Sequence, residues 1–290
     1  MYSYKFYSFT ETVIALNNKH RIYLQYQGYL ETASIFTTEN NPFSQQLFSL
    51  NLIKAPAELA STIAIKENLM LGKRVEAFFK IQIEEENSYK IILKNIQIQK
   101  EKITLGELDF ILKEKSTSAL KHVEVSYKFY LFDPNIEGNE IDKWIGPNRN
   151  DNLLKKITKL SEHQFPMLYR NEATKQLSLN NKEITQEVLF KAQLYIPFKN
   201  TTKRFKAINI DAIRGYYISF KDFLQLQMEK ELFFIPQKQD WLMRANDNKA
   251  WHNLDTIRDE LCRSIQIKKS LLIWSKDKHK NTKNLFITWW

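Results

Sequence analysis

The sequence predicts an α/β fold, in which helices pack against a central sheet. Two segments place apolar residues at helical spacing, and four are rich in the β-branched and aromatic residues that favour strands. These segments follow one another through the middle of the chain. In order, they are a helix at 65–84, strands at 88–99, 103–114 and 122–132, a helix at 150–165, and a strand at 184–198.

The first predicted helix has an apolar face and few residues that break helices. Leu71, Val75, Phe78 and Phe79 fall on one side of a helix, and Gly72 is its only Gly or Pro. The next three segments contain many Ile, Val, Tyr and Phe residues, which fit a pleated, half-buried surface. Polar turns separate these segments, so we expect a run of consecutive strands.

The second predicted helix follows a cluster of turn residues that includes Gly146-Pro147. Three apolar residues and one amide form a stripe along it: Leu153, Ile157, Leu160 and Gln164. The strand after it ends at Pro197, which cannot donate a ladder hydrogen bond.

The two ends of the chain give less regular patterns. Residues 21–36 fit a helix or a strand, because their aromatics follow neither period. The last part predicts a helix and a short strand within 215–242, a helix at 253–267, and closing strands at 268–275 and 284–290. We expect one domain with three parts: a mixed extension at 1–60, a core at 61–200, and an α/β extension at 201–290.

Composition excludes several classes of protein. With 290 residues and 43% hydrophobic content, the chain is long enough to bury a sizeable core. Its single cysteine, Cys262, rules out an internal disulfide and a Cys-rich zinc site, so a reducing cytoplasm fits best. The first residues lack the apolar run of a signal peptide, and no apolar stretch is long enough to cross a bilayer.

The net charge of +10 favours an anionic partner. A basic balance is typical of proteins that bind nucleic acid or a membrane surface, although a general enrichment in Lys would also produce it. We expect nucleic acid as the partner and no membrane. The oligomeric state stays open.

Two of the predicted strands carry acids on one face. Side chains alternate along a strand, so Glu107 and Asp109 share a face, as do Glu124, Ser126 and Lys128. If the strands are neighbours, Asp109 and Glu124 lie side by side and repel each other unless a proton or cation lies between them. A hard divalent cation, which prefers oxygen ligands, would neutralise that repulsion. The alternative is a half-exposed sheet whose acids face water.

The same residues carry a resemblance to a known superfamily. Gly106-Glu-Leu-Asp109, followed by Glu124 and a lysine further along the next strand, resembles the PD-(D/E)XK nucleases. The segment "LGKRVEAFF" at 71–79 supplies Gly72 and Glu76, which match the first-helix acid of that superfamily. More narrowly, the chain resembles the bacterial DUF1853 family from about residue 20 to the C-terminus, most strongly over 70–200. Four segments carry that resemblance: "TLGELDFIL", "HVEVSYKFYL", "GPNRNDNLLKKITKLSEHQ" and "EVLFKAQLYIPF".

The resemblance implies a restriction-endonuclease-like αβββαβ core, with a mixed central sheet flanked by helices and with N- and C-terminal additions. It also implies hydrolysis of phosphodiester bonds in DNA or RNA with Mg²⁺ or Mn²⁺. Asp109 and Glu124 would be metal ligands, and Glu76 would hold the metal directly or through water. Lys128 would stabilise the developing charge or orient the attacking water, and Glu107 is a further candidate ligand. In the superfamily, the helix after the third strand often points a polar residue at the site, here Gln164.

One position departs from the superfamily pattern. Ser126 stands where lysine is expected, two residues after Glu124, and Lys128 lies two further on. Its Cα would be roughly 13 Å from that of Glu124. Lys113 or Lys121 could substitute for it. If none of them reaches the metal, we expect a catalytically inactive protein that binds nucleic acid on a nuclease-like fold.

Further polar residues have both a functional and a structural explanation. Arg149, Lys155, Lys156 and Lys159 lie before or on the second helix, where they would grip phosphates or form a solvated helix face. His122 shares the face of Glu124 and could lie beside the site.

Overall fold

The computed structural model describes residues 9–180, 183–199, 204–226 and 231–290. Its helices are α1 (Phe9–Glu31), α2 (Leu59–Thr62), α3 (Leu71–Glu86), α4 (Leu153–Lys159), α5 (Phe165–Met167), α6 (Asn171–Leu177), α7 (Phe220–Leu224) and α8 (Leu254–Gln266). A π-helix, η2 (Leu160–Gln164), joins α4 to α5, and short 3-10 helices are η1 (Ile141–Lys143), η4 (Ile210–Ala212), η5 (Lys238–Leu242) and η6 (Ala245–Asp247). Its strands are β1 (Gln46–Leu47), β2 (Tyr89–Lys100), β3 (Ile103–Glu114), β4 (Leu120–Phe132), β5 (Trp144–Ile145), β6 (Thr185–Pro197), β7 (Ile213–Ser219), β8 (Leu232–Phe234), β9 (Leu271–Lys276) and β10 (Thr282–Thr288).

One mixed sheet runs through the described part of the chain. Its strands lie in the order β2-β3-β4-β6-β7-β10-β9-β8, with β1 on β6 and β5 on β4. The β2, β3 and β4 strands are antiparallel, whereas β4, β6, β7 and β10 run parallel. The predicted mixed central sheet flanked by helices is confirmed, and the C-terminal strands belong to the same sheet as the central ones.

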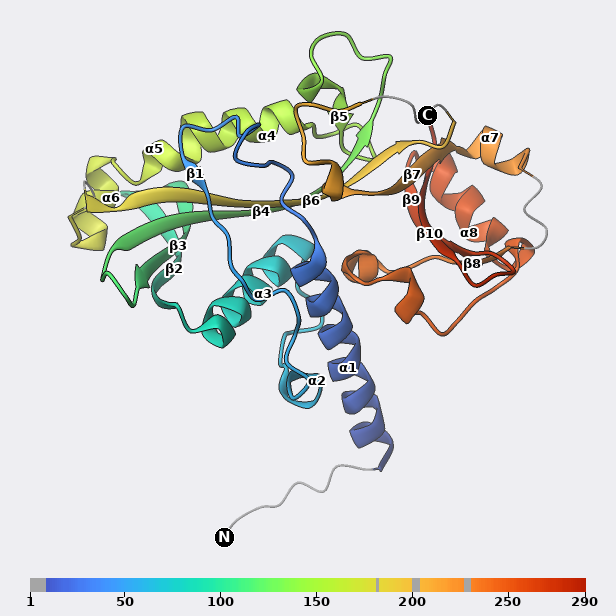
Figure 1. The fold of residues 1–290 in the computed structure, drawn as a ribbon, viewed down its shortest axis with the longest axis horizontal. Coiled ribbons are helices and arrows are strands. Elements are labelled where there is room, and N and C mark those ends of the chain that lie inside the picture. The colour runs from blue at the N-terminus through green and yellow to red at the C-terminus, as the bar shows by residue number, and fades with distance from the viewer. Residues whose placement is uncertain (1–8, 181–182, 200–203, 227–230) are drawn as a thin grey trace.

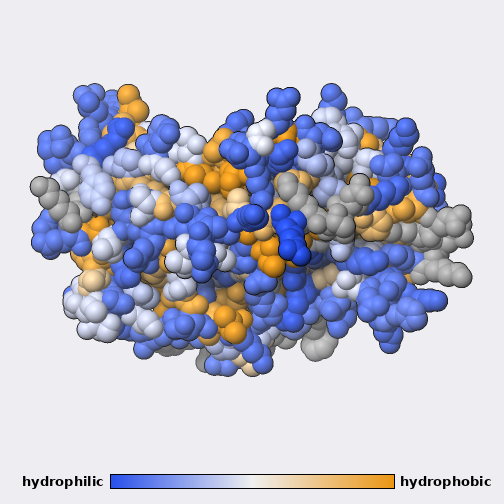
Figure 2. Space-filling model, turned by 45° about the horizontal axis from the view of Figure 1, so that its top comes forward, coloured by the Kyte–Doolittle hydropathy of each residue, from blue (hydrophilic) through white to orange (hydrophobic). Residues whose placement is uncertain are grey.

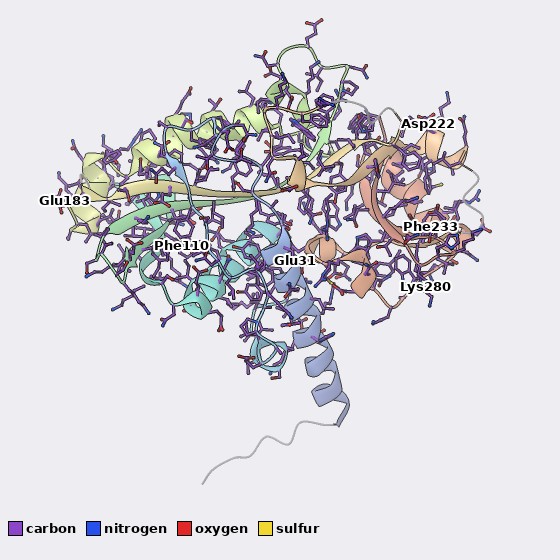
Figure 3. The ribbon with its side chains drawn as sticks, in the orientation of Figure 1. Glu31, Phe110, Glu183, Asp222, Phe233 and Lys280 are labelled. Atoms are coloured by element: carbon purple, nitrogen blue, oxygen red, sulfur yellow. The ribbon has the colours of Figure 1, made fainter. Side chains whose placement is uncertain are left out.

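Helices cover both faces of this sheet. In Figure 1, α1 and α3 lie on one side of β4 and β6, and α4, α5 and α6 lie on the other. On the α3 side, Phe110 from β3 packs edge-on against Phe79, with ring centroids 4.8 Å apart. Figure 3 labels Phe110 beneath the sheet. The segments predicted as helix, three strands, helix and strand are therefore α3, β2, β3, β4, α4 and β6.

The helix predicted at 65–84 begins later than the sequence pattern suggests, at Leu71. The buried Arg74 explains the difference, since its guanidinium donates to the carbonyls of Lys66 and Glu67, at 3.2 and 2.6 Å. The carbonyls of Lys66 and Glu67 thus accept from a side chain and not from a helical backbone N–H, so the helix does not extend back to them. At the other end, Asn87 closes α3 in the left-handed conformation, with φ of 59°.

Residues 21–36, which fitted helix or strand, are helical to Glu31. Gly28 lets this helix approach the C-terminal part of the chain closely. A Cβ at Gly28 would lie 1.8 Å from the carbonyl oxygen of Leu242, which no side chain can tolerate. The N-terminal helix and the 3-10 helix η5 therefore meet backbone to backbone.

Most of the face shown in Figure 2 is hydrophilic, and apolar residues appear on it as separate patches. This distribution suits a chain with a formal net charge of +10. Within the described ranges, no helix combines the length and the apolar content that a bilayer crossing requires.

Candidate active site

The site is built where two neighbouring strands part. The β3–β4 ladder ends at the pair Phe110 and Val123, while β4 continues beside β6 as far as Leu131. Directly beyond the last pair, the Asp109 carboxylate accepts a hydrogen bond from the Val125 N–H, at 2.8 Å. The side chain thus replaces the missing ladder partner, and this bond fixes its carboxylate at the fork between the strands.

Three carboxylates meet at this fork. Glu76 from α3 and Glu107 and Asp109 from β3 each offer an oxygen, and these oxygens all lie within 4.8 Å of one another. The expected ligand set was Glu76, Asp109 and Glu124, so Glu107 takes the place of Glu124 in this group. Such a set of oxygen donors is of the kind that Mg²⁺ and Mn²⁺ prefer.

Two cationic or amide donors already contact this acid group. The Lys73 ammonium bridges Glu76 and Glu107, at 2.9 and 2.6 Å. Asn95 donates to the same two carboxylates, and it adopts a left-handed φ of 52° opposite Asp109 in the β2–β3 register. The three acids are therefore partly neutralised by the chain itself.

Glu124 is fully buried and held from both sides. His122 donates to one of its oxygens through Nε2, at 2.9 Å, and the Gln164 amide donates to the other. The ring tautomer follows from Gln186, whose amide nitrogen lies 3.0 Å from His122 Nδ1 and also donates to the carbonyl of Phe165. An amide nitrogen only donates, so Nδ1 accepts and Nε2 carries the proton.

Lys156 lies at this site rather than on an outer helix face. Its ammonium donates to Gln164 Oε1, at 2.9 Å, so an unbroken chain of hydrogen bonds joins Lys156, Gln164 and Glu124. Burial lowers the pKa of Lys156 to about 8, and the charges of Glu124 and Asp109 oppose that shift.

The π-helix explains how Gln164 meets Lys156. Residues eight apart in an α-helix differ by roughly 80° around the axis. The wider turn of η2 adds about one residue and offsets that angle, so Gln164 comes into line with Lys156. His163 is then turned outward and is exposed. π-turns of this kind are frequent at functional sites.

The environment of Asp109 disfavours its charged form. Burial raises its pKa above the ordinary aspartate range, and the neighbouring carboxylates of Glu124 and Glu76 raise it further. The Val125 hydrogen bond and the Lys156 ammonium act in the opposite direction. A divalent cation at this point would relieve the repulsion that these acids exert on one another.

The three lysines considered from the sequence are placed elsewhere. Lys128 shares a cleft of about 640 Å³ with Glu76 and Ser126, but its ammonium pairs with Asp151, at 2.5 Å. Lys121 pairs with Glu187, also at 2.5 Å. Lys113 lies opposite Leu120, at the far end of the β3–β4 ladder.

The four basic residues predicted to grip phosphates do not form one group. Lys155 and Lys159 are exposed on α4, whereas Lys156 points inward. The Arg149 guanidinium pairs with the buried Asp133, at 2.9 Å, and lies 4.6 Å from the Trp290 ring centroid. Arg149 therefore joins the turn before α4 to the C-terminal end of the chain.

Strand alternation placed Asp109 and Glu124 near each other, and the resemblance added Glu76 and Gln164, but neither placed Lys156 beside them. Eight residues separate Lys156 from Gln164, and only a π-turn brings that spacing onto one face. One signal in the sequence pointed to this side of the helix: the polar Gln164 ends a stripe that begins at Leu153 and is otherwise apolar.

Comparison with known proteins gives one match. A family model described as a domain of unknown function, DUF1853, matches residues 25–284. No curated protein matches the chain, and no solved structure does.

Proposed function

The chain belongs to the DUF1853 family, and we propose that it is a nuclease that uses Mg²⁺ or Mn²⁺ to hydrolyse phosphodiester bonds in DNA or RNA. One observation carries this proposal: the carboxylates of Glu76, Glu107 and Asp109 converge within 4.8 Å at a strand fork. The half-buried Lys156 acts electrostatically on Asp109 at the same place.

The donor set fits a hard divalent cation. Asp109, Glu76 and Glu107 would hold it, and Glu124 on the adjacent strand would add negative charge beside Asp109. When bound, such an ion supplies Lewis acidity and makes a nearby water more acidic. The convergence of one buried and two half-buried acids, which otherwise repel one another, supports this assignment.

The protein's own groups supply the remaining electrostatics. Phosphodiester hydrolysis adds negative charge to a group that is already anionic, so a fixed cation stabilises the transition state. Lys156 is that cation, and Gln164 orients its ammonium. Gln164 and His122 also hold Glu124, which keeps its carboxylate from rotating.

The order of elements supports a restriction-endonuclease-like core. Helix α3, the antiparallel strands β2, β3 and β4, helix α4, and the parallel strand β6 follow one another as that core requires. Ser126 and Lys128 of β4 line the cleft of about 640 Å³ beside Glu76, where a substrate would lie. The net charge of +10 favours an anionic polymer over a neutral one.

The test combines metal binding with cleavage. We expect Mn²⁺ to bind the purified chain in calorimetry and to support cleavage of single- and double-stranded DNA and RNA. Asp109→Ala should abolish both effects, whereas Glu84→Gln, which alters an exposed ion pair with Lys80, should leave both unchanged. A wild-type chain that binds no Mn²⁺ would exclude the nuclease.

A catalytically inactive protein that binds nucleic acid is the second candidate, and three ion pairs made by two lysines favour it. Lys73 occupies the space between Glu76 and Glu107, and Lys128 is bound to Asp151. Under this alternative, Lys73→Met would not create Mn²⁺ binding, and the wild type would bind nucleic acid equally well in EDTA.

A further inference from the structure

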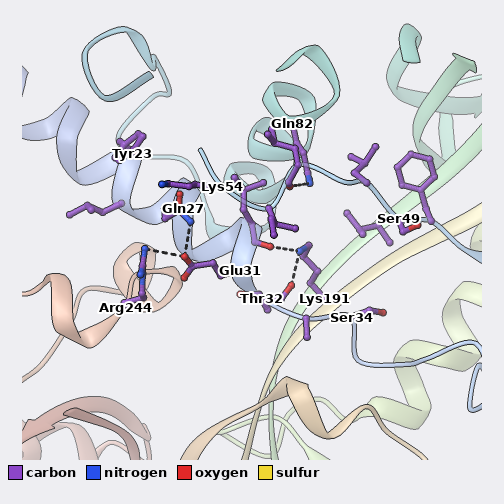
Figure 4. Close-up of a pocket in the computed structure, with 18 residues that line it drawn as sticks. Tyr23, Gln27, Glu31, Thr32, Ser34, Ser49, Lys54, Gln82, Lys191 and Arg244 are labelled. Atoms are coloured by element: carbon purple, nitrogen blue, oxygen red, sulfur yellow. Dashed lines mark hydrogen bonds and ion pairs between the residues drawn. The ribbon is translucent and has the colours of Figure 1, made fainter. Parts of the chain in front are cut away.

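A second cavity, of about 770 Å³, lies between α1, the segment 48–54 and strand β6. Figure 4 shows that its lining side chains come from all three of these elements and from Arg244. Its lining shares no residue with the cleft that contains Glu76. Its volume is in the range of small-molecule sites.

The most unusual residue in this cavity is a lysine on a central strand. Lys191 lies in β6 and is only 9% exposed. Its ammonium donates to the carbonyls of Leu30 and Thr32, at 3.0 and 2.6 Å, and so caps the C-terminal end of α1 (Figure 4). An ammonium has three donors, so one is left after these two bonds.

The cavity does not supply a counter-charge for Lys191. Among the described residues, no carboxylate forms an ion pair with it, and the one acid of the lining is Glu31. Glu31 pairs with Arg244, at 3.0 Å, and accepts from Gln27, at 2.6 Å. Burial lowers the pKa of Lys191 to about 8, with no neighbouring charge acting against it. The partners of this buried ammonium are two neutral carbonyls and the Tyr29 ring, 5.2 Å from it, so its charge is not neutralised, and a bound anion would neutralise it.

The rest of the cavity offers an apolar surface. Leu24, Leu30, Phe48, Leu50, Leu52 and Leu189 line it. Ile53 lines it as well while remaining 71% exposed, which leaves a large apolar side chain in contact with water. A ligand that covers these side chains gains hydrophobic free energy.

We propose that this cavity binds a small monocarboxylate with an aliphatic body. The carboxylate accepts the remaining Lys191 donor, and the aliphatic body covers the leucines and Ile53. Of the other cations in the lining, Lys54 is exposed and Arg244 pairs with Glu31. A single buried ammonium with one free donor matches a monoanion, whereas a phosphate dianion needs several donors. The proposal is independent of any nuclease activity.

Calorimetric titration of the full chain with hexanoate, octanoate, decanoate and 1-decanol tests the proposal. Each added methylene should increase affinity about fourfold until the cavity is filled. Decanoate should bind at least tenfold more tightly than 1-decanol, which has the same body without the charge. Equal affinity for decanoate and 1-decanol, or no binding of decanoate, would overturn the proposal.

Two kinds of variant locate the site. Lys191→Met should abolish the preference for decanoate over 1-decanol while circular dichroism shows a folded chain. Lys191→Met also removes the cap of α1 and could prevent folding. In that case, a matched pair of substitutions at the exposed Ile53 tests whether the ligand lies in this cavity. Ile53→Glu should weaken decanoate at least fivefold relative to Ile53→Gln, and identical affinities for this pair would place the ligand elsewhere.

Discussion

Replacing Asp109 by asparagine tests the electrostatics of the candidate active site directly. Asp109→Asn keeps the shape of the side chain and an acceptor for the Val125 N–H. Burial first, and then the charges of Glu124 and Glu76, raise the pKa of Asp109 from 3.8 to about 8. Between these two pKa values, the folded chain keeps a proton on the Asp109 carboxyl that the unfolded chain has already released.

The sign and size of the effect follow from proton linkage. Because the unfolded state binds fewer protons here, the wild type loses up to about 1.4 kcal/mol of unfolding free energy per pH unit as the pH rises. Asp109→Asn has no such loss, so the unfolding free energy of the variant minus that of the wild type should grow between pH 5 and pH 7. The upper bound on that growth is about 2.7 kcal/mol, and we expect at least ~1 kcal/mol because Lys156 favours the carboxylate.

The assay is urea denaturation at pH 5, 6 and 7 in EDTA, with Glu84→Gln as the control for loss of an exposed acid. A stability difference that stays constant or shrinks as the pH rises would refute the reasoning about Asp109. Adding Mn²⁺ should reverse the order, because only the wild type retains the metal site. At 100 times the dissociation constant, the metal stabilises the wild type by about 2.7 kcal/mol.

Four further substitutions address basic residues at the site or on the elements beside it. Lys156→Met should lower cleavage at least a hundredfold while calorimetry shows Mn²⁺ binding retained, because Lys156 contributes charge rather than a metal ligand. Lys73→Met should increase Mn²⁺ affinity severalfold in the same titration, since the Lys73 ammonium competes for two of the carboxylates. Arg149→Ala should reduce stability in urea by about 1 kcal/mol through loss of the Asp133 pair, whereas Lys155→Ala should weaken nucleic-acid binding without a loss of stability.

Local patterns in the sequence determine much of this fold. Hydrophobic period and β-branched content predict the type and order of α3, β2, β3, β4, α4 and β6, although not the short elements β5 and α6. Strand alternation also places Asp109 and Glu124 on facing positions of neighbouring strands, close enough for Glu124 to raise the pKa of Asp109. These features depend on contacts within one element or between adjacent ones, so a periodic pattern carries them.

Tertiary structure alone decided which groups complete the site. Lys128 lies on the expected face, yet Asp151 binds its ammonium, whereas Lys156 from α4 donates to Gln164. Glu107 joins the acid group because β3 pairs with β4 only from Phe110 onward, which leaves Glu107 and Asp109 beyond the end of the ladder. The side chains that meet at such a fork depend on where a ladder ends and how a helix turns. The end of a ladder and the turn of a helix are both set by packing between segments that are distant in the sequence. A local periodic pattern contains no information about such packing.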